Sequence, residues 1–577
     1  MTPLLPQLIA HGLQLELIEP IDQLLADHCL RQLPKELSKR DEERVRLLLI
    51  HLSIATRSGL LYLSKETATL QLQPKVGELW HPVDQQAFHW LKRWHGELQE
   101  QLEQGWQLLL SLPSLPASLR LIDEQRLYWR RWWQAEQRLS QQLAERLLHQ
   151  VALPIDTARA ERLFEEWKSE LLLLPEQLAA VRSASQQTLT LISGGPGTGK
   201  THTAAFIVEL LWQALAIEQG KPLRIALVAP TGKAAAALSH RIASQIRRRQ
   251  DGVAPPIHSS TLHSLLSLQL ERHSQLPPCL PYDLLLVDES SMVDLLSMER
   301  LFRAVAPHAR LVLLGDHHQL PAVEPGAPFR QLIDQLATTQ RAAICLRRSL
   351  RTDKSAILEL AEAVKQGDTR RVLQQLNSPS SDGTLAWRYA DGLPEPPDET
   401  SLDELADRFY AVSLLPQEQQ LTPLRLLTPH RRGCWGAEAL NEAIRGRLIA
   451  RWQGPAPFVA PILIGVNDYQ LELYNGEMGL LFLHQPQLGL QPEDYCLFVK
   501  TDQSQRQLPA SLLPRYEWGW CFSVHKSQGS EFHQVIVAIP EGSARFGRPF
   551  LYTAITRARL QLELWGGKEQ LAATLAS

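Results

Sequence analysis

The chain has 577 residues, which is too many for one compact domain and predicts about four structural units of roughly 150 residues each. Because 44% of its residues are apolar and 21% are charged, it can bury large cores, which excludes a collagen-like or low-complexity chain. The formal net charge of −3 argues against a basic coat for nucleic acid but leaves room for a local basic groove.

Residues 1 to about 115 are predicted to form a mainly helical domain, because apolar residues recur at helical spacing in segments such as EERVRLLLIHLSIATRSG. Eight of the 15 tryptophans lie before residue 170, including Trp90 and Trp94, which are four residues apart. Two interpretations stay open: these rings pack into a core, or they form a docking face for a partner protein, where tryptophan is enriched. The segment SLPSLPAS at 111–118 predicts a linker to the next domain.

From about residue 186, short apolar runs alternate with helical segments, starting with TLTLIS, RIALVA, DLLLVD and ARLVLLGD. Near-continuous apolar strands are typical of parallel sheets that helices cover on both faces. Residues 116–345, including a leading helical segment, are therefore predicted to form a first α/β domain. A second series, LRLLTP, HQVIVAIP and LQLELW, predicts another α/β domain over residues 346–577.

Residues from about 445 to 515 interrupt this second series with a different pattern. The segments PILIGVNDYQLELYNGEMGLLFLHQ and EDYCLFVK predict short strands, and Asn475–Gly476 is a hairpin signal. We therefore expect a small antiparallel barrel that is inserted into the second α/β domain.

The motif GGPGTGKT lies between the predicted strand TLTLIS and a helical segment, which is the setting of a phosphate-binding P-loop. Its glycines allow backbone N–H groups to surround phosphate oxygens, and the dipole of the following helix favours negative charge. Lys200 is expected to reach the β- and γ-phosphates, and the hydroxyl of Thr201 is expected to bind Mg²⁺. The candidate nucleotide-binding residues of this loop are Gly194, Gly195, Pro196, Gly197, Thr198, Gly199, Lys200 and Thr201.

Two acidic residues, Asp288 and Glu289, follow the predicted strand DLLLV and should lie at its C-terminal end. Alone, such a pair would more often be an ordinary solvated strand end. About 90 residues after a P-loop, it instead indicates the acidic half of a nucleotide site, in which Asp288 holds Mg²⁺ and Glu289 polarises the attacking water.

The segment LLGDHHQLPAVEPG ends a further strand and supplies Gln319, whose amide both donates and accepts hydrogen bonds and therefore suits a γ-phosphate sensor. Asp316 is open to two interpretations, a functional group or a structural cap. His317 and His318 lack carboxylate or cysteine partners at metal spacing, so a zinc role is not expected.

Hydrolysis of ATP needs positive charge at the γ-phosphate, which an arginine usually supplies. Arg351 in CLRRSLRTDK and Arg557 in FLYTAITRAR are the candidates, and both lie beyond the first α/β domain. Either one, taken alone, would be interpreted as a surface residue.

The six cysteines are scattered and form no C-x-x-C pair, which argues against a disulfide framework or a zinc site. No apolar run approaches the roughly 18 residues that a membrane helix needs. The first residues, MTPLLPQLIAHG, lack the basic region of a signal peptide. We therefore expect a cytoplasmic protein with reduced thiols.

In their order along the chain, these motifs resemble those of the superfamily 1 helicases, in the 5′→3′ branch that includes the RecD-like helicases. The resemblance covers about residue 170 to the C-terminus. Besides the blocks quoted above, the matching segments are PEQLAA, APTGKAAAAL, STLHSLL, LTPHRRGCWGAEALN, NDYQLELYNGEMG, SVHKSQGSEF and LYTAITRAR. One departure is Ser290, where the family commonly has alanine, and this small-for-small change leaves both acids in place.

The resemblance implies an α/β fold with two RecA-like parallel-sheet motor domains of the P-loop NTPase type, a mainly helical N-terminal domain and a small SH3-like β-barrel insertion. It places Gln177 at the adenine-reading position, adds Gly529 and Glu531 to the ATP pocket, and places Arg351 and Arg557 at phosphate-contacting positions. The implied contacts to the DNA backbone come from Thr231, Lys233, His263, Ser523, His525 and Lys526.

Only 193 residues precede the P-loop glycines, and they contain no clear helix-hairpin-helix signal. The resemblance therefore implies a helicase subunit of the exodeoxyribonuclease V complex, which works beside RecB and RecC on single-stranded DNA and double-stranded DNA ends. Because no metal-nuclease constellation is recognised in the sequence, the nuclease would belong to RecB. A stand-alone RecD-like helicase, or a P-loop ATPase with a purely regulatory or structural role, are the alternatives.

Overall fold

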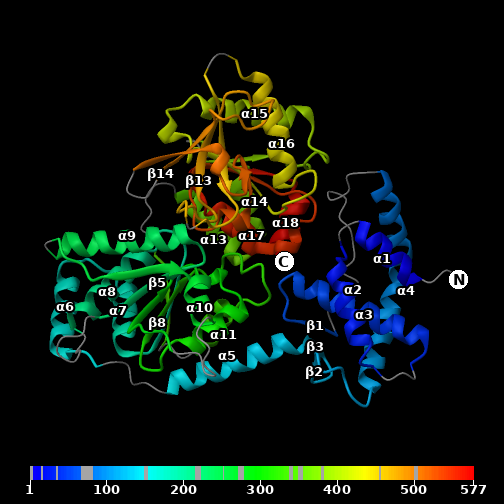
Figure 1. Ribbon diagram of the computed structural model, residues 1–577, viewed down its shortest axis with the longest axis horizontal. Helices are drawn as coiled ribbons and strands as arrows, with labels where there is room; N and C mark the ends of the chain where they lie inside the picture. Colours follow the sequence, from blue (N-terminus) through cyan, green and yellow to red (C-terminus); the bar gives the residue numbers. More distant parts are fainter. Residues whose placement is uncertain are drawn as a thin grey trace. The chain divides into compact units, whose positions relative to one another are not determined.

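The computed structural model describes residues 4–14, 17–33, 37–65, 82–148, 154–214, 223–250, 252–270, 279–336, 342–348, 355–378, 383–453, 456–468, 470–499 and 504–577. Its elements, many of which are labelled in Figure 1, belong to two compact units. The first unit comprises the described residues up to Ala144 together with Val293–Phe302 and Pro321–Pro328. The second comprises Glu145–Met292, Arg303–Leu320 and Phe329–Ser577.

The first unit is mainly helical, as the sequence predicts, but it also contains a small antiparallel sheet of order β1-β3-β2. Its strands have only three or four residues each, which is too short for an alternating pattern to be recognised. The elements are α1 (Leu4–Gln14), α2 (Pro20–Leu30), α3 (Lys39–Arg57), β1 (Tyr62–Ser64), α4 (Pro82–Ser111), β2 (Leu119–Ile122), β3 (Arg126–Trp129) and most of α5 (Arg130–Leu148).

Helix α3 is the buried centre of the first unit, and it contains the titratable side chain of His51 in its apolar part. The rings of Trp90 and Trp94 on α4 are half-buried, with centroids 6.4 Å apart, and the ring of His11 lies 5.0 Å from that of Trp90. Because these rings pack on one another and are only half-buried, the docking role proposed for them stays a prediction.

The last turn of α5 belongs to the second unit, where Arg146 is buried. Its guanidinium donates hydrogen bonds of 2.9–3.1 Å to four main-chain carbonyl oxygens, those of Thr188, Val305, Ala306 and Ala309. Burial lowers the pKa of Arg146 to about 10, so the side chain stays charged near neutral pH.

The first α/β domain is built on a six-stranded sheet of order β6-β5-β7-β8-β4-β9, and every neighbouring pair in it is parallel. The four apolar runs that the sequence analysis identified are confirmed as strands. The sequence does not reveal β6 and β9, because IHSST is largely polar and AICL is very short. The strands are β4 (Leu189–Gly194), β5 (Ile225–Ala229), β6 (Ile257–Thr261), β7 (Leu284–Val287), β8 (Arg310–Gly315) and β9 (Ala343–Leu346).

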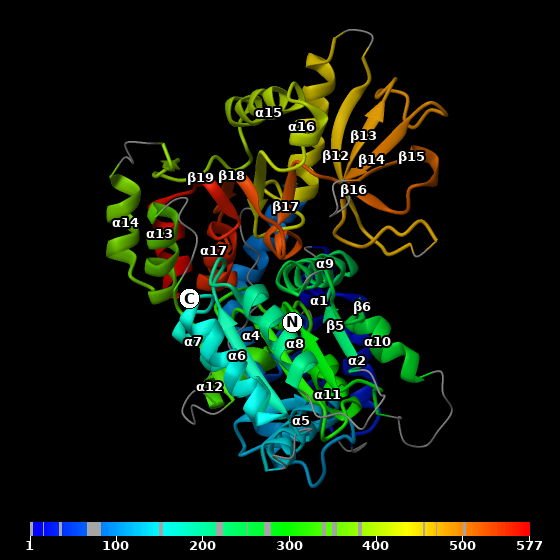
Figure 2. The same ribbon diagram turned by 90° about the vertical axis from the view of Figure 1, so that its left-hand side faces the viewer.

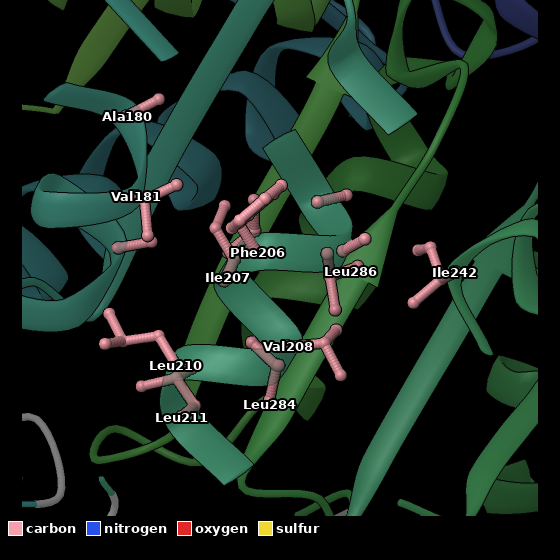
Figure 3. Close-up of a cluster of buried hydrophobic side chains, with 14 of the residues drawn as sticks. Ala180, Val181, Phe206, Ile207, Val208, Leu210, Leu211, Ile242, Leu284 and Leu286 are labelled. Atoms are coloured by element: carbon pink, nitrogen blue, oxygen red, sulfur yellow. The ribbon is translucent and has the colours of Figure 1, made fainter. Parts of the chain in front are cut away.

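Helices α6 (Thr157–Ser169), α7 (Pro175–Gln186), α8 (Lys200–Ala214) and α9 (Gly232–Arg249) contribute to one apolar core with the same face of this sheet. Figure 3 shows part of that core, in which Leu284 and Leu286 of β7 pack with Phe206, Ile207 and Val208 of α8. Because strand side chains alternate between faces, these two leucines share a face while Leu285 belongs to the other. The remaining helices between β6 and β9 are α10 (Leu262–Leu270), α11 (Leu295–Ala304), most of which belongs to the first unit, and α12 (Pro328–Leu336).

The second α/β domain has a five-stranded sheet of order β10-β19-β18-β11-β17, also parallel throughout. One face packs on α13, α14, α17 and α18, and the other on α15 and α16. The strands are β10 (Leu385–Arg388), β11 (Leu424–Thr428), β17 (Cys521–Ser523), β18 (Phe532–Ala538) and β19 (Ala558–Trp565). The helices are α13 (Ser355–Gln366), α14 (Thr369–Asn377), α15 (Glu399–Ser413), α16 (Ala437–Arg451), α17 (Gly547–Ile555) and α18 (Lys568–Ala576).

An antiparallel sheet of order β15-β14-β13-β12-β16 is inserted between α16 and β17, where the sequence predicts an insertion (Figure 2). Its strands are β12 (Phe458–Ile464), β13 (Met478–Leu483), β14 (Tyr495–Val499), β15 (Gln505–Pro509) and β16 (Tyr516–Trp518). Gly476 but not Asn475 has a positive φ, so the Asn-Gly pair turns the chain within a longer loop and not as a two-residue hairpin. Closure of this sheet into an SH3-like barrel stays a prediction. Among the described helices, none is long and apolar enough to cross a membrane.

Candidate functional site

The loop between β4 and α8 has the backbone of a phosphate cradle. Gly197 and Gly199 have φ values of +76° and +86°, a backbone conformation that residues other than glycine rarely adopt. A Cβ atom on Gly199 would also lie 2.4 Å from Nε2 of Gln177, so this glycine is required for close approach as well. Helix α8 begins at Lys200, directly after the loop. The amides of its first turn therefore face the loop, where the helix dipole favours an anion.

Lys200 folds back over this loop. Its Nζ atom donates hydrogen bonds to the carbonyl oxygens of Gly194 at 2.6 Å and Gly195 at 3.2 Å. The Thr198 hydroxyl donates to the same Gly195 carbonyl at 2.8 Å, which holds the loop closed on itself. Among the described residues, the ammonium group donates its hydrogen bonds to neutral oxygens, and a phosphate would be a stronger partner for it.

Gln177 is buried under the loop. Its Oε1 atom accepts a hydrogen bond from the backbone N–H of Leu174 at 2.9 Å, which caps the start of α7. Its Nε2 atom donates to the carbonyl oxygen of Thr198 at 2.9 Å. The residue at the expected adenine-reading position is therefore joined to the P-loop through one side chain.

Asp288 and Glu289 lie directly after β7, as predicted, and both are half-buried. The backbone N–H of Glu289 donates to Oδ1 of Asp288 at 2.9 Å, and Glu289 has a φ of +50°, a strained conformation that costs about 1 kcal/mol or more. Burial raises the pKa of both carboxyl groups, and the charge of Asp288 raises the pKa of Glu289 further, while nearby Lys200 opposes both shifts. Ser290 is buried, and its hydroxyl donates a hydrogen bond to the carbonyl of Val287. The hydroxyl that stands where the family commonly has alanine therefore has a local hydrogen-bond partner.

The turn after β8 contains Asp316 and Gln319, both buried. Asp316 does cap the turn, since its Oδ1 accepts the N–H of His318 at 3.1 Å. Its Oδ2 accepts the hydroxyl of Tyr552 at 2.9 Å and the side-chain amide of Gln319 at 3.4 Å. The buried Oε1 of Gln319 accepts no hydrogen bond from any described residue, so it is free to accept one from a ligand.

Two residues of the second α/β domain approach Glu289. A Cβ atom on Gly529, whose φ is +73°, would lie 3.8 Å from Oε1 of Glu289, and the charge of Arg557 lowers the pKa of the same carboxyl group. Arg557 is buried and donates to the carbonyls of Thr553 at 3.1 Å and Ser530 at 3.2 Å. Elements of both α/β domains thus meet at one carboxylate.

The other residues expected around the nucleotide are placed only in part. Glu531 is an exposed residue directly before β18. Pro196 is half-buried within the P-loop. Arg351 lies outside the described residues, so its phosphate-contacting role stays a prediction.

The candidate DNA contacts of the first α/β domain follow strands β5 and β6. Thr231 is the N-cap of α9, and its hydroxyl accepts the N–H of Ala234 at 3.3 Å. His263 is exposed at the start of α10. The side chain of Lys233 lies outside the described part of the structure.

The candidate DNA contacts of the second α/β domain lie together at the end of β17. Ser523 precedes the 3₁₀ turn Val524–Ser527, which contains His525 and Lys526. Burial lowers the pKa of His525, which keeps its ring neutral near pH 7. The Nζ atom of Lys526 pairs with Oε2 of Glu517 on β16 at 2.5 Å, so this cation already has a partner.

Sequence reasoning missed residues that join the two α/β domains. Tyr552 and Thr553, both on α17, contact the turn after β8, and Gln528 contacts the same turn. The segment LYTAITRAR was singled out for its arginine only, although a tyrosine and two threonines in an apolar helix are polar groups that need partners. The ring of Tyr474 is a further contact, because it lies against the backbone of Gly232 at the start of α9.

The donor set fits Mg²⁺ bound together with a nucleotide. Thr201 in the first turn of α8 and Asp288 offer the oxygen ligands that this ion prefers. The described residues contain no group of three or more His, Cys, Asp or Glu side chains that could hold a metal ion by themselves. Mg²⁺ usually takes one or two protein ligands plus substrate phosphates, which agrees with this arrangement.

The chain is similar to known proteins over most of its length. The family described as "AAA domain" matches residues 172–381, and the "UvrD-like helicase C-terminal domain" matches residues 519–564. It is 36% identical to the RecBCD enzyme subunit RecD of Mycolicibacterium smegmatis, over 69% of this chain and 72% of that protein. It is 32% identical to the RecD subunit of Mycobacterium tuberculosis over 80% of both. The ATP-dependent RecD2 DNA helicase of Deinococcus radiodurans is 30% identical over 78% of this chain but only 56% of its own length.

Proposed function

Because the chain belongs to the RecD family of helicase subunits, we propose that it is an ATP-dependent 5′→3′ DNA helicase that acts beside RecB and RecC. In that complex it would unwind double-strand DNA ends for recombinational repair and influence the nuclease activity that RecB carries. The observation that carries the proposal is the approach of Gly529 and Arg557, from the second α/β domain, to Glu289 of the first. A clamp of two such domains around ATP is what a motor of this kind requires.

Each group of the nucleotide site has a proposed role. The loop amides and Lys200 bind the phosphates of ATP, and Gln177 with Gly529 and Glu531 completes the pocket. Glu289 accepts a proton from the attacking water, and burial favours this because it brings the pKa of the carboxyl group closer to the working pH. Gln319 orients the γ-phosphate or the water through its unpaired Oε1.

Positive charge at the γ-phosphate comes from Arg557, with Arg351 as the second phosphate contact. Arg557 is held by neutral carbonyls, and an anion would replace them as the stronger partner. Thr201 and Asp288 would hold Mg²⁺, which when bound neutralises charge on the phosphates.

The DNA track is proposed to cross both α/β domains. Its contacts are Thr231, Lys233 and His263 from the first domain and Ser523, His525 and Lys526 from the second. They bind the sugar-phosphate backbone, so binding should be independent of sequence and sensitive to salt. If the domains close on ATP and open after hydrolysis, the two sets of contacts move relative to each other and advance the strand.

The domain boundaries proposed are a docking domain over residues 1–115 and motor domains over 116–345 and 346–577. The docking domain would bind the RecC side of the complex through part of its tryptophan-bearing surface. Because the proposed substrate is a double-strand DNA end, the proposed location of the protein is the cytoplasm.

A strand-displacement assay tests both the direction of unwinding and the motor activity of this subunit. The complex of this chain with RecB and RecC should unwind 5′-tailed duplexes through this subunit, and substitution of Lys200 should remove that contribution. ATP turnover by this subunit without any unwinding of 5′-tailed or 3′-tailed duplexes would instead support a regulatory ATPase. Unwinding by the chain alone, with no stable association with RecB and RecC, would support the stand-alone helicase.

A further inference from the structure

Three hydrogen bonds fasten the turn after β8 to the second α/β domain. The backbone N–H of Leu320 donates to Oγ1 of Thr553 at 2.8 Å, and its carbonyl accepts Nε2 of Gln528 at 2.8 Å. The hydroxyl of Tyr552 donates to Oδ2 of Asp316 at 2.9 Å. Both backbone groups of one residue and a buried carboxylate are therefore used in contacts between domains.

Tyr552 lies directly over the P-loop. A Cβ atom on Gly195 would be 2.8 Å from the tyrosine hydroxyl, so this glycine leaves the space that the hydroxyl occupies. The ring is buried and lies edge-to-face to that of His318, with centroids 6.0 Å apart. Burial and the carboxylate of Asp316 raise the pKa of Tyr552 well above its ordinary value, so the hydroxyl remains a donor at any working pH.

The same carboxylate oxygen holds the candidate γ-phosphate sensor. Oδ2 of Asp316 accepts the tyrosine hydroxyl at 2.9 Å and the amide of Gln319 at 3.4 Å, so the tyrosine makes the shorter bond. Without the hydroxyl, Oδ2 would be left to the Gln319 amide alone. A tighter Gln319–Asp316 bond would hold the sensor away from a ligand.

The chain segment that follows the candidate DNA contacts binds the same turn as Tyr552. Gln528, which binds Leu320, follows Lys526 by two residues, and Leu320 follows Gln319 directly. Tyr552 and Thr553 lie on α17, which ends just before Arg557. The turn that carries Gln319 is therefore bound by Gln528, two residues after the candidate DNA contact Lys526, and by the helix α17 that precedes Arg557.

We propose that Tyr552 is a positioning residue that couples the sensor Gln319 to the DNA-binding segment Ser523–Lys526, so that ATP hydrolysis reaches its full rate only with DNA bound. The inference rests on the proposed helicase function and adds a residue to it. Tyr552 acts through Asp316 and not on the nucleotide itself. Its removal should therefore change how strongly DNA stimulates hydrolysis, more than how tightly ATP binds.

The test is Tyr552→Phe in the full chain, with oligo(dT) as the DNA probe. The ratio of kcat for ATP hydrolysis with and without oligo(dT) should fall at least tenfold, while KM for ATP changes less than threefold. Tyr389→Phe is the matched control, because it removes a hydroxyl that bonds Ser401 Oγ at 2.8 Å elsewhere in the same domain. This control should keep the wild-type ratio. A Tyr552→Phe ratio within twofold of wild type would overturn the proposal.

A double variant shows whether the effect passes through Asp316. If it does, Tyr552→Phe combined with Asp316→Asn should be no worse than the more impaired single variant. Additive losses would overturn the proposed route, provided that thermal unfolding shows all variants folded. If the wild-type chain shows no DNA-stimulated hydrolysis at all, the helicase proposal fails; if only the variant ratio is unchanged, the coupling proposal alone fails.

Discussion

The side-chain amide of Gln177 donates a 2.9 Å hydrogen bond to the main-chain carbonyl of Thr198, and its other end caps α7 at the N–H of Leu174. One buried side chain thus braces the P-loop and fixes the start of the neighbouring helix. A base that is read by this amide must compete with one of these two bonds. In the proposed role of Gln177, nucleotide choice and loop geometry would therefore be linked at this residue.

Gln177→Leu should raise KM for ATP about tenfold and reduce the preference for ATP over GTP, because both hydrogen bonds are lost and two buried groups lose their partner. Steady-state hydrolysis with each nucleotide measures both effects. Gln366→Leu on the exposed face of α13 is the control and should leave both values unchanged. Unaltered KM and unaltered ATP preference in Gln177→Leu would mean that the residue only braces the loop.

Lys200→Gln should abolish ATP hydrolysis and translocation while the chain stays folded and assembled. The shorter neutral amide can still approach the Gly194 carbonyl, so the loop is kept, but the positive charge at the phosphates is lost. Phosphate release and co-purification with RecB and RecC are the measurements. Lys365→Gln, which removes a surface ion pair with Glu362 on α13, should retain full turnover. Hydrolysis retained in Lys200→Gln would refute the site assignment.

Glu289→Gln should lower kcat by about 10²–10⁴-fold, the range expected for loss of a general base. Nucleotide affinity should change little, because the amide has the same shape and the strained backbone at φ +50° is unaltered. Binding of a fluorescent ATP analogue and single-turnover hydrolysis separate the two quantities. Glu362→Gln on α13 is a matched control. A kcat within tenfold of wild type would show that a residue other than Glu289 is the general base.

In the proposed DNA-binding site, the carboxylate of Glu517 would compete with DNA phosphates for Lys526. Because Glu517 holds the lysine at 2.5 Å, Glu517→Gln should free the cation and tighten binding to oligo(dT) about threefold, the scale of a half-exposed ion pair. Lys526→Gln should weaken binding and lower the slope of log K against log salt by about 1. Anisotropy titrations at several salt concentrations measure both. If Glu517→Gln weakened binding, Lys526 would be a structural partner of β16 and not a phosphate contact.

The buried side chain of His51 should make the folding stability of the first unit depend on pH. Burial lowers its pKa to about 4, and its Nε2 accepts no hydrogen bond from any described residue. The unfolded chain binds the proton near pH 6.5, so stability is full above that pH and falls as pH drops from 6.5 to 4, by up to about 3 kcal/mol.

The measurement is the difference in thermal unfolding between wild type and His51→Leu at pH 7.5 and pH 5. Wild type should lose more stability than His51→Leu on acidification. Substitution of the exposed His28 by Leu should leave the wild-type pH dependence intact. Equal acid sensitivity in wild type and His51→Leu would show that the imidazole is protonated in the folded chain or is reached by water.

The long apolar strands and the P-loop were predictable because burial on both faces and glycine at positive φ leave strong local signals. Strands β6, β9, β10 and β17 were not, since short or half-polar runs adopt the extended conformation only because a neighbouring strand supplies hydrogen bonds. The three-stranded sheet of the first unit was not predictable for the same reason. Its pairing partners, Tyr62 and Tyr128, are 66 residues apart in sequence, and no local pattern joins them.

The positions of candidate site residues were predictable where a polar side chain lies just after a predicted strand, as at Asp288 and Gln319. Contacts between domains were not, because a hydroxyl such as that of Tyr552 is identified as functional only by the partner that faces it. The resemblance to a family supplied the positions of Arg557 and Gln177, and the structure supplied their present partners. The spacing of these residues along the sequence would have predicted neither their positions in the site nor their partners.

Arg146 differs from the cations proposed to contact DNA in what it binds. Its four acceptors among the described residues are uncharged peptide oxygens, and its pKa of about 10 keeps it protonated at neutral pH. Counter-ions weaken contacts between opposite charges, and they have no opposite charge to screen here. Concentrated salt should therefore release DNA bound at the proposed contacts while the last turn of α5 keeps its hydrogen bonds, so nucleic acid can be removed during purification without disturbing this part of the second unit.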